Sequence, residues 1–257
     1  MVYRKFKIEN VMEPQLIEKK LVKNSYDFLK KQLPWSKNSF THTHHRVLPN
    51  ATLAPWLNDD EFLKTYEKIK DYTLVDIYRC YELWVLAKQI TNIEGAILEV
   101  GVWRGGTGLL MAEANRYTNK KIYLADTFNG VVKAGAKDTT YKGGEHDDTS
   151  VELVSNLISN LSLNNIDLLE GIFPEETSHR VTEKIAMLHC DVDVYNSSKD
   201  VVQWCLSRMS IGSLIVFDDY GFFGCEGITT YCNELKLRKD LIFIHNLNGH
   251  AIFVKIF

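Results

Sequence analysis

Four aspartates stand where two apolar runs end, and their spacing points to chemistry. Asp191 and Asp193 fall in the stretch HCDVDVYNSS, and Asp218 and Asp219 are adjacent in IVFDDYG. Two unit charges about 4 Å apart repel by roughly 4 kcal/mol at an effective dielectric of ~20, which means that such a cluster is not kept for stability. Either the acids point apart, as separate helix caps and surface groups, or a positive group lies between them.

A divalent cation is the positive group that these side chains suit best. Oxygen ligands from short acidic side chains favour Mg²⁺, Ca²⁺ or Mn²⁺ over Zn²⁺. If the two apolar runs are neighbouring parallel strands, their carboxyl ends line one crevice. Asp191 and Asp193 share a strand face by the period of two, whereas Asp218 and Asp219 share one only if the chain has already turned, and Gly221 makes such a turn feasible.

The stretch ILEVGVWRGGTG (97–108) places four glycines between a strand-like run and a helical one. Backbone without side chains lets a ligand approach the N-terminus of the helix that follows. The pattern is neither the G-x-G-x-x-G dinucleotide fingerprint nor a P-loop, since no lysine follows the glycines. Glu99, at the end of the run, disfavours a pyrophosphate and favours a cationic ligand. A glycine turn needed only for packing is the alternative.

Asp126 ends the next apolar run. In doubly wound folds this is where an acid binds the ribose hydroxyls of an adenosine-containing ligand. Together with Glu99 and the glycines, Asp126 favours a nucleoside that carries no pyrophosphate. S-adenosylmethionine has a ribose, a cationic sulfonium and an ammonium group but no phosphate, and we therefore predict it as the ligand.

Short strand-like runs alternate with helical patterns from about residue 95 onward. The runs are almost continuously apolar, as parallel strands buried on both faces are, and they span 96–102, 121–128, 166–173, 184–193 and 213–220. Helical patterns span 148–161 and 198–209, the second with Ser197 or Ser198 as its expected cap. The tail reads as two strands around an Asn-Gly loop. We predict an α/β fold with a doubly wound, mostly parallel sheet and an antiparallel C-terminal edge strand.

The first ~95 residues have a different pattern. A helical stripe of apolar residues spans 59–90, as one long helix or two consecutive ones, with Asp59 among the residues that could cap its start. Residues 34–57 show little periodicity, and we predict that 1–57 form an irregular cap or lid over the core. We therefore predict two parts, an N-terminal cap or lid at 1–70 and a core domain at 71–257.

Composition sets the broad class of the protein. The chain has 257 residues, a net charge of -3, 45% hydrophobic and 25% charged residues, which is an ordinary globular balance. No basic block stands out, and this argues against nucleic acid as the main partner. The five cysteines form no C-x-x-C pair, and neither a signal peptide nor a membrane-spanning run is evident. We expect a cytoplasmic protein with reduced thiols and no membrane partner.

Five stretches, in this order, resemble the macrocin O-methyltransferase family: LEVGVWRGG, ADTFNG, LLEGIFPEET, CDVDVYNSS and VFDDYG. With TLVDIYR ahead of them, the resemblance covers about residues 72–257. Members of that family are metal- and S-adenosylmethionine-dependent O-methyltransferases that act on sugar hydroxyls of natural products. The resemblance implies the same reaction class and a seven-stranded, class I methyltransferase-like sheet of Rossmann-like topology.

The resemblance also implies roles for the acids. In that family the acid that opens D-x-D-x-Y and both acids of D-D-Y hold the divalent metal, which implies Asp191, Asp218 and Asp219 as ligands of Mg²⁺ or another hard divalent cation. The second acid of D-x-D-x-Y, here Asp193, is implied as the general base in some members. The chain has Val192 where the family usually has glycine, a change that removes no ligand.

The expected reaction is in-line transfer of a methyl group to a metal-held hydroxyl that Asp193 deprotonates. The acceptor is expected to be a sugar-bearing small molecule, and the protein a homo-oligomer. The predicted contacts of S-adenosylmethionine come from the glycine stretch, the ends of the following strands and one acid of the metal set: Glu99, Gly101, Arg104, Gly105, Thr107, Asp126, Thr127, Gly171 and Asp191.

Three alternatives stay open at this point. The same fold could methylate a catechol-like phenol or another small diol, since adjacent hydroxyls of either kind can chelate a metal. A non-catalytic adenosine-binding protein or an NAD-linked oxidoreductase is a second class, against which the missing G-x-G-x-x-G and the acid cluster argue. A methyltransferase-like scaffold without activity is the third, and the presence of all four aspartates argues against it.

Overall fold

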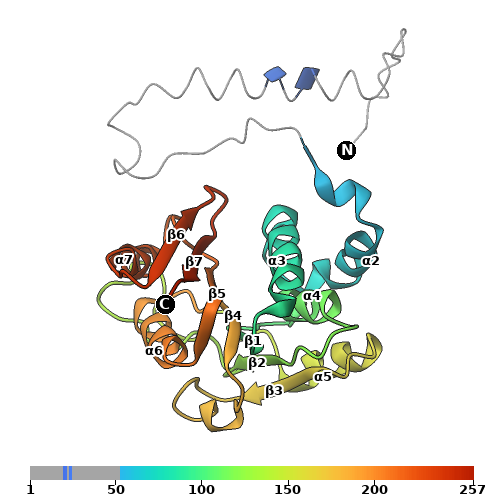
Figure 1. The fold of residues 1–257 in the computed structure, drawn as a ribbon. Helices are drawn as coiled ribbons and strands as arrows, with labels where there is room; N and C mark the ends of the chain where they lie inside the picture. Colours follow the sequence, from blue (N-terminus) through green and yellow to red (C-terminus); the bar gives the residue numbers. More distant parts are fainter. Residues whose placement is uncertain (1–19, 22, 25–52) are drawn as a thin grey trace, which may run out of the picture. The chain divides into compact units, whose positions relative to one another are not determined.

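Seven strands form one sheet that carries the whole architecture (Figure 1). The computed structural model describes residues 20, 21, 23, 24 and 53–257. The strand order is β3-β2-β1-β4-β5-β7-β6, with the strands at Ala96–Val100 (β1), Ile122–Asp126 (β2), Ile166–Glu170 (β3), Ile185–Cys190 (β4), Met209–Phe217 (β5), Leu241–His245 (β6) and Ala251–Lys255 (β7). The predicted doubly wound, mostly parallel sheet is confirmed.

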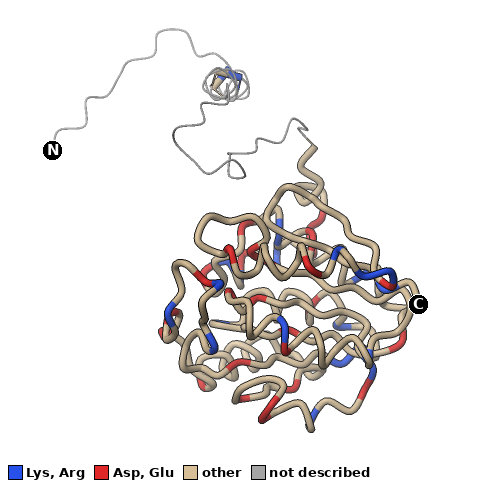
Figure 2. Tube along the Cα trace, turned by 90° about the vertical axis from the view of Figure 1, so that its left-hand side faces the viewer, with Lys and Arg blue, Asp and Glu red and all other residues tan. Residues whose placement is uncertain are grey.

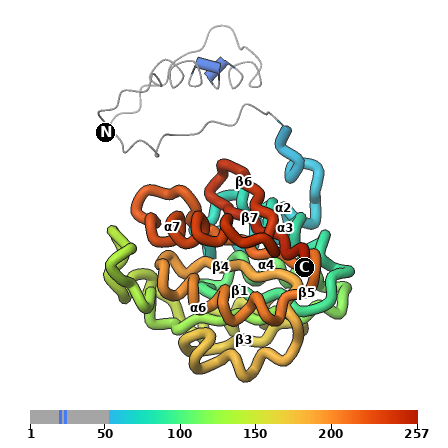
Figure 3. Tube along the Cα trace, turned by 60° about the vertical axis from the view of Figure 1, so that its left-hand side comes forward, coloured from blue at the N-terminus to red at the C-terminus, as the bar shows by residue number. Residues whose placement is uncertain are grey.

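The C-terminal strand β7 is antiparallel to both of its neighbours, β5 and β6. The antiparallel strand at this end of the sheet was therefore predicted correctly. It lies one position inside the edge, because the chain places β6 outside it, and Figure 3 shows β6 and β7 beside α7 at this end of the molecule. The connection between β6 and β7 contains the expected Asn-Gly turn, with Gly249 at φ +109°.

Helices cover both faces of the sheet and bury two apolar clusters. One face packs against α2 (Asp60–Ile69), α3 (Ile77–Gln89), α4 (Gly106–Ala114) and α5 (Val151–Asn160). The other face packs against α6 (Tyr195–Leu206) and α7 (Glu226–Leu235). Central strands such as β1 and β4 are buried along their whole length, which explains their continuous apolar runs.

The helical stripe at 59–90 is two helices, α2 and α3, with a short 3-10 turn (Lys70–Tyr72) and an extended stretch between them. Asp59 caps α2, as predicted, by accepting a hydrogen bond of 2.9 Å from the Phe62 N–H. Asp76 caps α3 by accepting from the N–H groups of Tyr78 and Arg79. Asp76 thus starts a new helix, and the stretch between the two helices reaches the sheet's carboxyl edge.

Helix α6 begins at Tyr195, three residues before the predicted start, and the expected serine cap was wrong. The cap comes instead from a distant loop, since the Asp138 carboxylate accepts a hydrogen bond of 2.9 Å from the Tyr195 N–H. Ser198 lies inside the helix, where its hydroxyl donates to the Val194 carbonyl. Sequence spacing does not reveal a cap of this kind, because it is made by tertiary contact.

Residues 53–257 form one compact unit. Residues 1–19, 22 and 25–52, most of the predicted cap, lie outside the described residues. Phe62 and Ile69 of α2 are fully buried in the core that covers the sheet. The predicted boundary at residue 70 stays a prediction, and α2, which lies ahead of it, contributes to this core.

Three further expectations concern the surface and the thiols. All five cysteines are free and buried. Over the face seen in Figure 2, Lys and Arg lie among Asp and Glu instead of gathering in a stripe. Among the described residues, no helix has both the length and the apolar character needed to cross a membrane.

Candidate functional site

The sheet order creates a crevice between β1 and β4. The chain runs from β1 outward through β2 and β3 on one side, and from β4 outward through β5 on the other. Ligands of open α/β sheets bind at the carboxyl ends of the strands where the order reverses in this way. A cavity lies there, walled by the loops after β1, β2, β4 and β5 and by the stretch between α2 and α3; its lining includes Thr73, Arg79, Gly101, Thr107, Asp126, Thr127, Tyr141, His146, Gly171, Asp191, Asp193, Asp218 and Asp219.

The strand register brings the acids together. Cys190 at the end of β4 pairs with Phe217 at the end of β5, and therefore Asp191 and Asp218 leave the sheet side by side. Carboxylate oxygens of Asp191, Asp218 and Asp219 all lie within 4.8 Å of one another. Strand β5 ends before its two acids, and the chain has begun to turn there, which lets Asp218 and Asp219 face one centre.

This cluster has the donor set of a hard divalent cation. Oxygens bound to one ion at about 2.0–2.6 Å lie at most roughly 4–5 Å apart, and the three carboxylates meet that limit. Burial raises the pKa of Asp191 and of Asp219 well above the ordinary value, and the neighbouring carboxylates raise both further. A cation at this point would relieve the repulsion, and the residues present therefore fit the metal that the sequence predicted.

Asp218 differs from the other two because positive groups hold it. Arg79 Nη1 donates to its Oδ2 at 2.5 Å, and His250 Nε2 lies 3.0 Å from its Oδ1. Burial alone would raise the pKa of Asp218, but the hydrogen bond to His250 and the charge of Arg79 outweigh burial and lower it. The two contacts also fix the direction of the Asp218 carboxylate. Neither Arg79 nor His250 was singled out from the sequence.

Asp193 lies beside the cluster in a left-handed backbone conformation, with φ +62°. Burial raises the pKa of Asp193, although hydrogen bonds with Asp219 and Tyr141 and the charge of His146 lower it in part. A carboxyl group that is half-buried, faces the cavity and has a raised pKa is suited to accept a proton. Tyr141 and His146 also line the cavity and were missed, because the long loop that holds them has no periodic pattern.

The glycine stretch forms the opposite wall. A side chain at Gly101 would place its Cβ 1.7 Å from the carbonyl oxygen of Asp191, and the residue has φ +89°. Glycine is thus required for the backbone of β1 to pass that of β4 beside the metal acids. Thr107, Thr127 and Gly171 line the same cavity.

Asp126 lines the cavity and also shapes it. Its Oδ2 accepts hydrogen bonds from the N–H groups of Val102 and Trp103 at 2.6 and 2.8 Å, and its Oδ1 accepts from Phe128 at 2.7 Å. The carboxylate therefore holds the loop after β1 against the loop after β2. Each carboxylate oxygen can accept more than one bond, which leaves capacity for a ribose hydroxyl.

Three of the residues predicted to contact S-adenosylmethionine do not line the cavity, and their assignment stays a prediction. Glu99 is fully buried beneath the wall, where its Oε1 accepts from the Thr107 hydroxyl at 2.7 Å and lies 2.8 Å from His189 Nδ1. Arg104 pairs with the exposed Asp148. Gly105 faces apolar side chains of α4 and α5. Its neighbour Thr107 does line the cavity.

Comparison with known proteins agrees with the fold and identifies the family. The profile of the family described as Macrocin-O-methyltransferase (TylF) matches residues 63–253. A similar protein of Streptomyces olivaceus, 8-demethyl-8-(2,3-dimethoxy-alpha-L-rhamnosyl)-tetracenomycin-C 4'-O-methyltransferase, is 25% identical over 197 residues, which cover 71% of this chain and 74% of that protein. Demethyldecarbamoylnovobiocin O-methyltransferase of Streptomyces niveus is 27% identical over 186 residues, which cover 66% and 70%.

Solved structures show the same architecture. The O-methyltransferase NovP aligns with a TM-score of 0.61 at 23% identity, covering 72% of this chain and 83% of its own. The calicheamicin methyltransferase CalS11 aligns with a TM-score of 0.61 at 14% identity, covering 82% and 98%. These likenesses establish the class I methyltransferase fold. Since the family profile spans most of the chain, the protein belongs to the macrocin O-methyltransferase family and is a methyltransferase.

Proposed function

We propose that the protein transfers the methyl group of S-adenosylmethionine to a hydroxyl of a sugar or a glycosylated natural product, with the help of a divalent cation. The observation that carries this proposal is the meeting of three metal-suited carboxylates, with Asp193 beside them, in the wall of the cavity that the glycine stretch also lines. The names of the relatives support an acceptor of this class, because they describe O-methyltransferases of a rhamnosyl-tetracenomycin, of demethyldecarbamoylnovobiocin and of mycinamicin III.

The four aspartates have different roles in the proposed reaction. Asp191, Asp218 and Asp219 would hold the cation, which when bound lowers the pKa of a hydroxyl that it contacts and fixes the direction of that hydroxyl. Asp193 accepts the hydroxyl proton while the oxygen attacks the methyl carbon and the carbon–sulfur bond breaks, leaving S-adenosylhomocysteine. Such proton transfer typically contributes about 10²–10⁴-fold to the rate, and positioning contributes much of the remainder.

The donor would lie on the glycine side of the cavity. Gly101, Thr107 and Gly171 border the space, and Asp126 has acceptor capacity for the ribose. The neutral or acidic character of this wall suits a sulfonium and disfavours a pyrophosphate. For this reason we favour methyl transfer over an NAD-linked reaction or a non-catalytic adenosine-binding function.

Methyl transfer from labelled S-adenosylmethionine to a panel of acceptors tests the proposal. Glycosylated aromatic and macrolide compounds should accept one methyl group, whereas the matching compounds without the sugar should not. EDTA should stop the reaction and Mg²⁺ should restore it. Transfer to catechols but to no sugar would establish the alternative acceptor, and full activity in EDTA would overturn the metal assignment.

Calorimetry separates the enzyme classes with the same preparation. S-adenosylhomocysteine should bind and NAD should not. The expected homo-oligomer is part of the proposal as well, and light scattering during size exclusion measures it directly; a mass of about one chain would reject it.

A further inference from the structure

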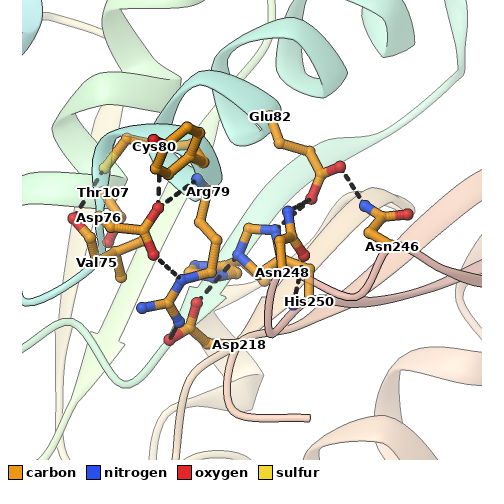
Figure 4. A network of polar contacts seen from close by, with 12 residues as sticks. Val75, Asp76, Arg79, Cys80, Glu82, Thr107, Asp218, Asn246, Asn248 and His250 are labelled. Carbon is orange, nitrogen blue, oxygen red and sulfur yellow. Dashed lines mark hydrogen bonds and ion pairs between the residues drawn. The ribbon is translucent and has the colours of Figure 1, made fainter. Parts of the chain in front are cut away.

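A chain of polar contacts leads from Asp218 away from the cavity to helix α3 (Figure 4). His250, fully buried just before β7, is the link: its Nε2 lies 3.0 Å from Asp218 Oδ1, and its Nδ1 lies 2.6 Å from Glu82 Oε2. Because the ring is rigid, fixing its Nδ1 side also fixes the nitrogen that faces Asp218.

Glu82 is where the chain of contacts is anchored. Its Oε1 accepts a hydrogen bond from the Asn246 side-chain amide, and its Oε2 accepts from Asn248 Nδ2 at 3.1 Å as well as facing His250. Asn248 in turn accepts a bond of 2.9 Å from the His250 N–H through its own Oδ1. One carboxylate on α3 therefore ties three residues of the β6–β7 connection to the helix.

Only a carboxylate satisfies all these partners. Both of its oxygens accept hydrogen bonds, whereas a glutamine side chain offers one acceptor oxygen and a donor NH₂ group. Glu82→Gln keeps the size of the side chain, but it sets a donor against the donor of Asn246 or against the nitrogens of Asn248 and His250. The substitution therefore loosens the contact without emptying a space in the core.

Asp218 needs such support because it stands at a turn. Strand β5 ends at Phe217, and the side chain of Asp218 is held from two directions, by Arg79 on Oδ2 and by His250 on Oδ1. Arg79 is itself fixed by Asp76, whose Oδ2 accepts from Arg79 Nε at 2.8 Å. Helix α3 thus supports Asp218 directly through Arg79, near its start, and indirectly through Glu82, which contacts His250 from its second turn.

We propose that Glu82 is a positioning residue for the metal centre: through His250 and the β6–β7 connection it holds Asp218 in the direction in which this carboxylate completes a divalent-cation site with Asp191 and Asp219. The inference rests on the proposed metal dependence. The inference gives α3 and the β6–β7 hairpin a role in orienting Asp218, a metal ligand that lies on neither of them. Partners that orient metal ligands typically change metal affinity by about 10–100-fold when they are removed.

Titration of the full-length chain with Mn²⁺, followed by electron paramagnetic resonance, tests the proposal. Glu82→Gln should raise the Kd for Mn²⁺ by about tenfold or more. Calorimetry with S-adenosylhomocysteine should give a Kd within about twofold of the wild type, because the substitution leaves the glycine wall intact. A general weakening of the fold would instead raise both dissociation constants. The matched control is Glu61→Gln on α2, which removes the exposed ion pair of Glu61 with Lys88 of α3 and should leave both dissociation constants unchanged.

A second variant keeps the test decisive if Glu82→Gln does not fold. Asn248→Ala leaves the Glu82 carboxylate in place and removes the bonds that Asn248 makes to it and to the His250 backbone, and the Kd for Mn²⁺ should rise by a smaller factor, about threefold to tenfold. Wild-type affinity for Mn²⁺ in both variants, or in Asn248→Ala where it alone folds, would overturn the role of Glu82. Failure of the wild-type chain to bind Mn²⁺ would instead reject the proposed metal function, and the two results are thus distinguishable.

Discussion

Asp193 has a backbone conformation that decides how its role should be tested. Its φ of +62° is left-handed, which asparagine and aspartate tolerate better than alanine. Asp193→Asn therefore removes the proton acceptor without adding backbone strain. We expect kcat to fall by about 10²–10⁴-fold, while the Kd for S-adenosylhomocysteine stays within about twofold.

The control for this variant is Asp60→Asn, which changes an exposed acid in the first turn of α2 and should leave kcat unchanged. If Asp193→Asn turned over at the wild-type rate, Asp193 would not be the base. Tyr141 and His146, the other cavity groups beside it, would then be the next candidates to substitute.

The pKa of Asp219 indicates what the acid cluster costs in folding free energy. Burial raises its pKa above the ordinary value of 3.8, and Asp218 and Asp193 raise it further. In the folded chain the group thus holds its proton more tightly than in the unfolded chain, and its contribution to stability is lost as the pH rises above 3.8 through the raised pKa. Asp219→Asn cannot ionise, and each unit of raised pKa that it removes is worth about 1.4 kcal/mol.

Thermal unfolding in EDTA measures this effect. Asp219→Asn should unfold at a higher temperature than the wild type, by a larger margin at about pH 8 than at about pH 5.5. Saturating Mn²⁺ should remove or reverse the difference, because it stabilises only the chain that binds it. The exposed Asp147→Asn serves as the control. A lower melting temperature for Asp219→Asn in EDTA at pH 8 would contradict a repulsive cluster.

At the residue scale, the sequence reveals the groups that stand next to strand ends. Asp191 and Asp218 were found because each directly follows an apolar run, and parallel strands deliver such residues to one edge. Arg79 could not be placed in the same way, since it is 139 residues from Asp218 in the chain and looks like one charged position on a helix. His250 and Glu82 could not be assigned to the site from the sequence for the same reason.

At the element scale, the passage of β1 past β4 depends on one residue. An alanine at Gly101 would meet the Asp191 carbonyl oxygen at 1.7 Å, in addition to the strain of φ +89°. Gly144 has nearly the same φ, +90°, but its added Cβ would meet nothing within 4 Å. The pair therefore separates steric overlap from backbone strain, which costs roughly 1–2 kcal/mol by itself.

We expect Gly144→Ala to lower stability by about 1–2 kcal/mol and to keep S-adenosylhomocysteine binding. Gly101→Ala should cost at least ~3 kcal/mol, beyond the range of most single substitutions, and should weaken binding of S-adenosylhomocysteine and Mn²⁺ together. Chemical denaturation and calorimetry give the two readouts. Equal losses in the two variants would mean that the backbones of β1 and β4 have room to move apart.

The elements themselves were predictable where burial is two-sided. The apolar runs located β1 to β4 within a few residues, although they overshoot the strand ends because the residues beyond serve the cavity. The sequence left open whether residues 59–90 form one helix or two, since the helical stripe continues across the break and the signal that a new helix begins is Asp76. Helix α6 starts early because Asp138 caps it from a distant loop.

At the scale of the whole molecule, the alternation of strands and helices was enough to predict the doubly wound sheet, because right-handed crossovers leave few other arrangements. The division of the chain at residue 70 stays a prediction. The helix ahead of that boundary, α2, packs closely against the rest of the core: Phe62 and Ile69 are fully buried, and the Trp84 ring N–H donates to Asp59 at 3.0 Å.

Two fragments of the chain separate the two possible boundaries. A fragment of residues 53–257 contains the whole compact unit and should unfold cooperatively and bind S-adenosylhomocysteine. A fragment of residues 71–257 loses α2, and emptying the sites of Phe62 and Ile69 costs about 2–5 kcal/mol each, which together reaches the usual 5–15 kcal/mol stability of a domain. We expect the shorter fragment to aggregate or to lack a cooperative transition in calorimetry. If both fragments melted at the same temperature, α2 would belong to the N-terminal cap. Its packing on the core would then contribute nothing to the stability of residues 71–257.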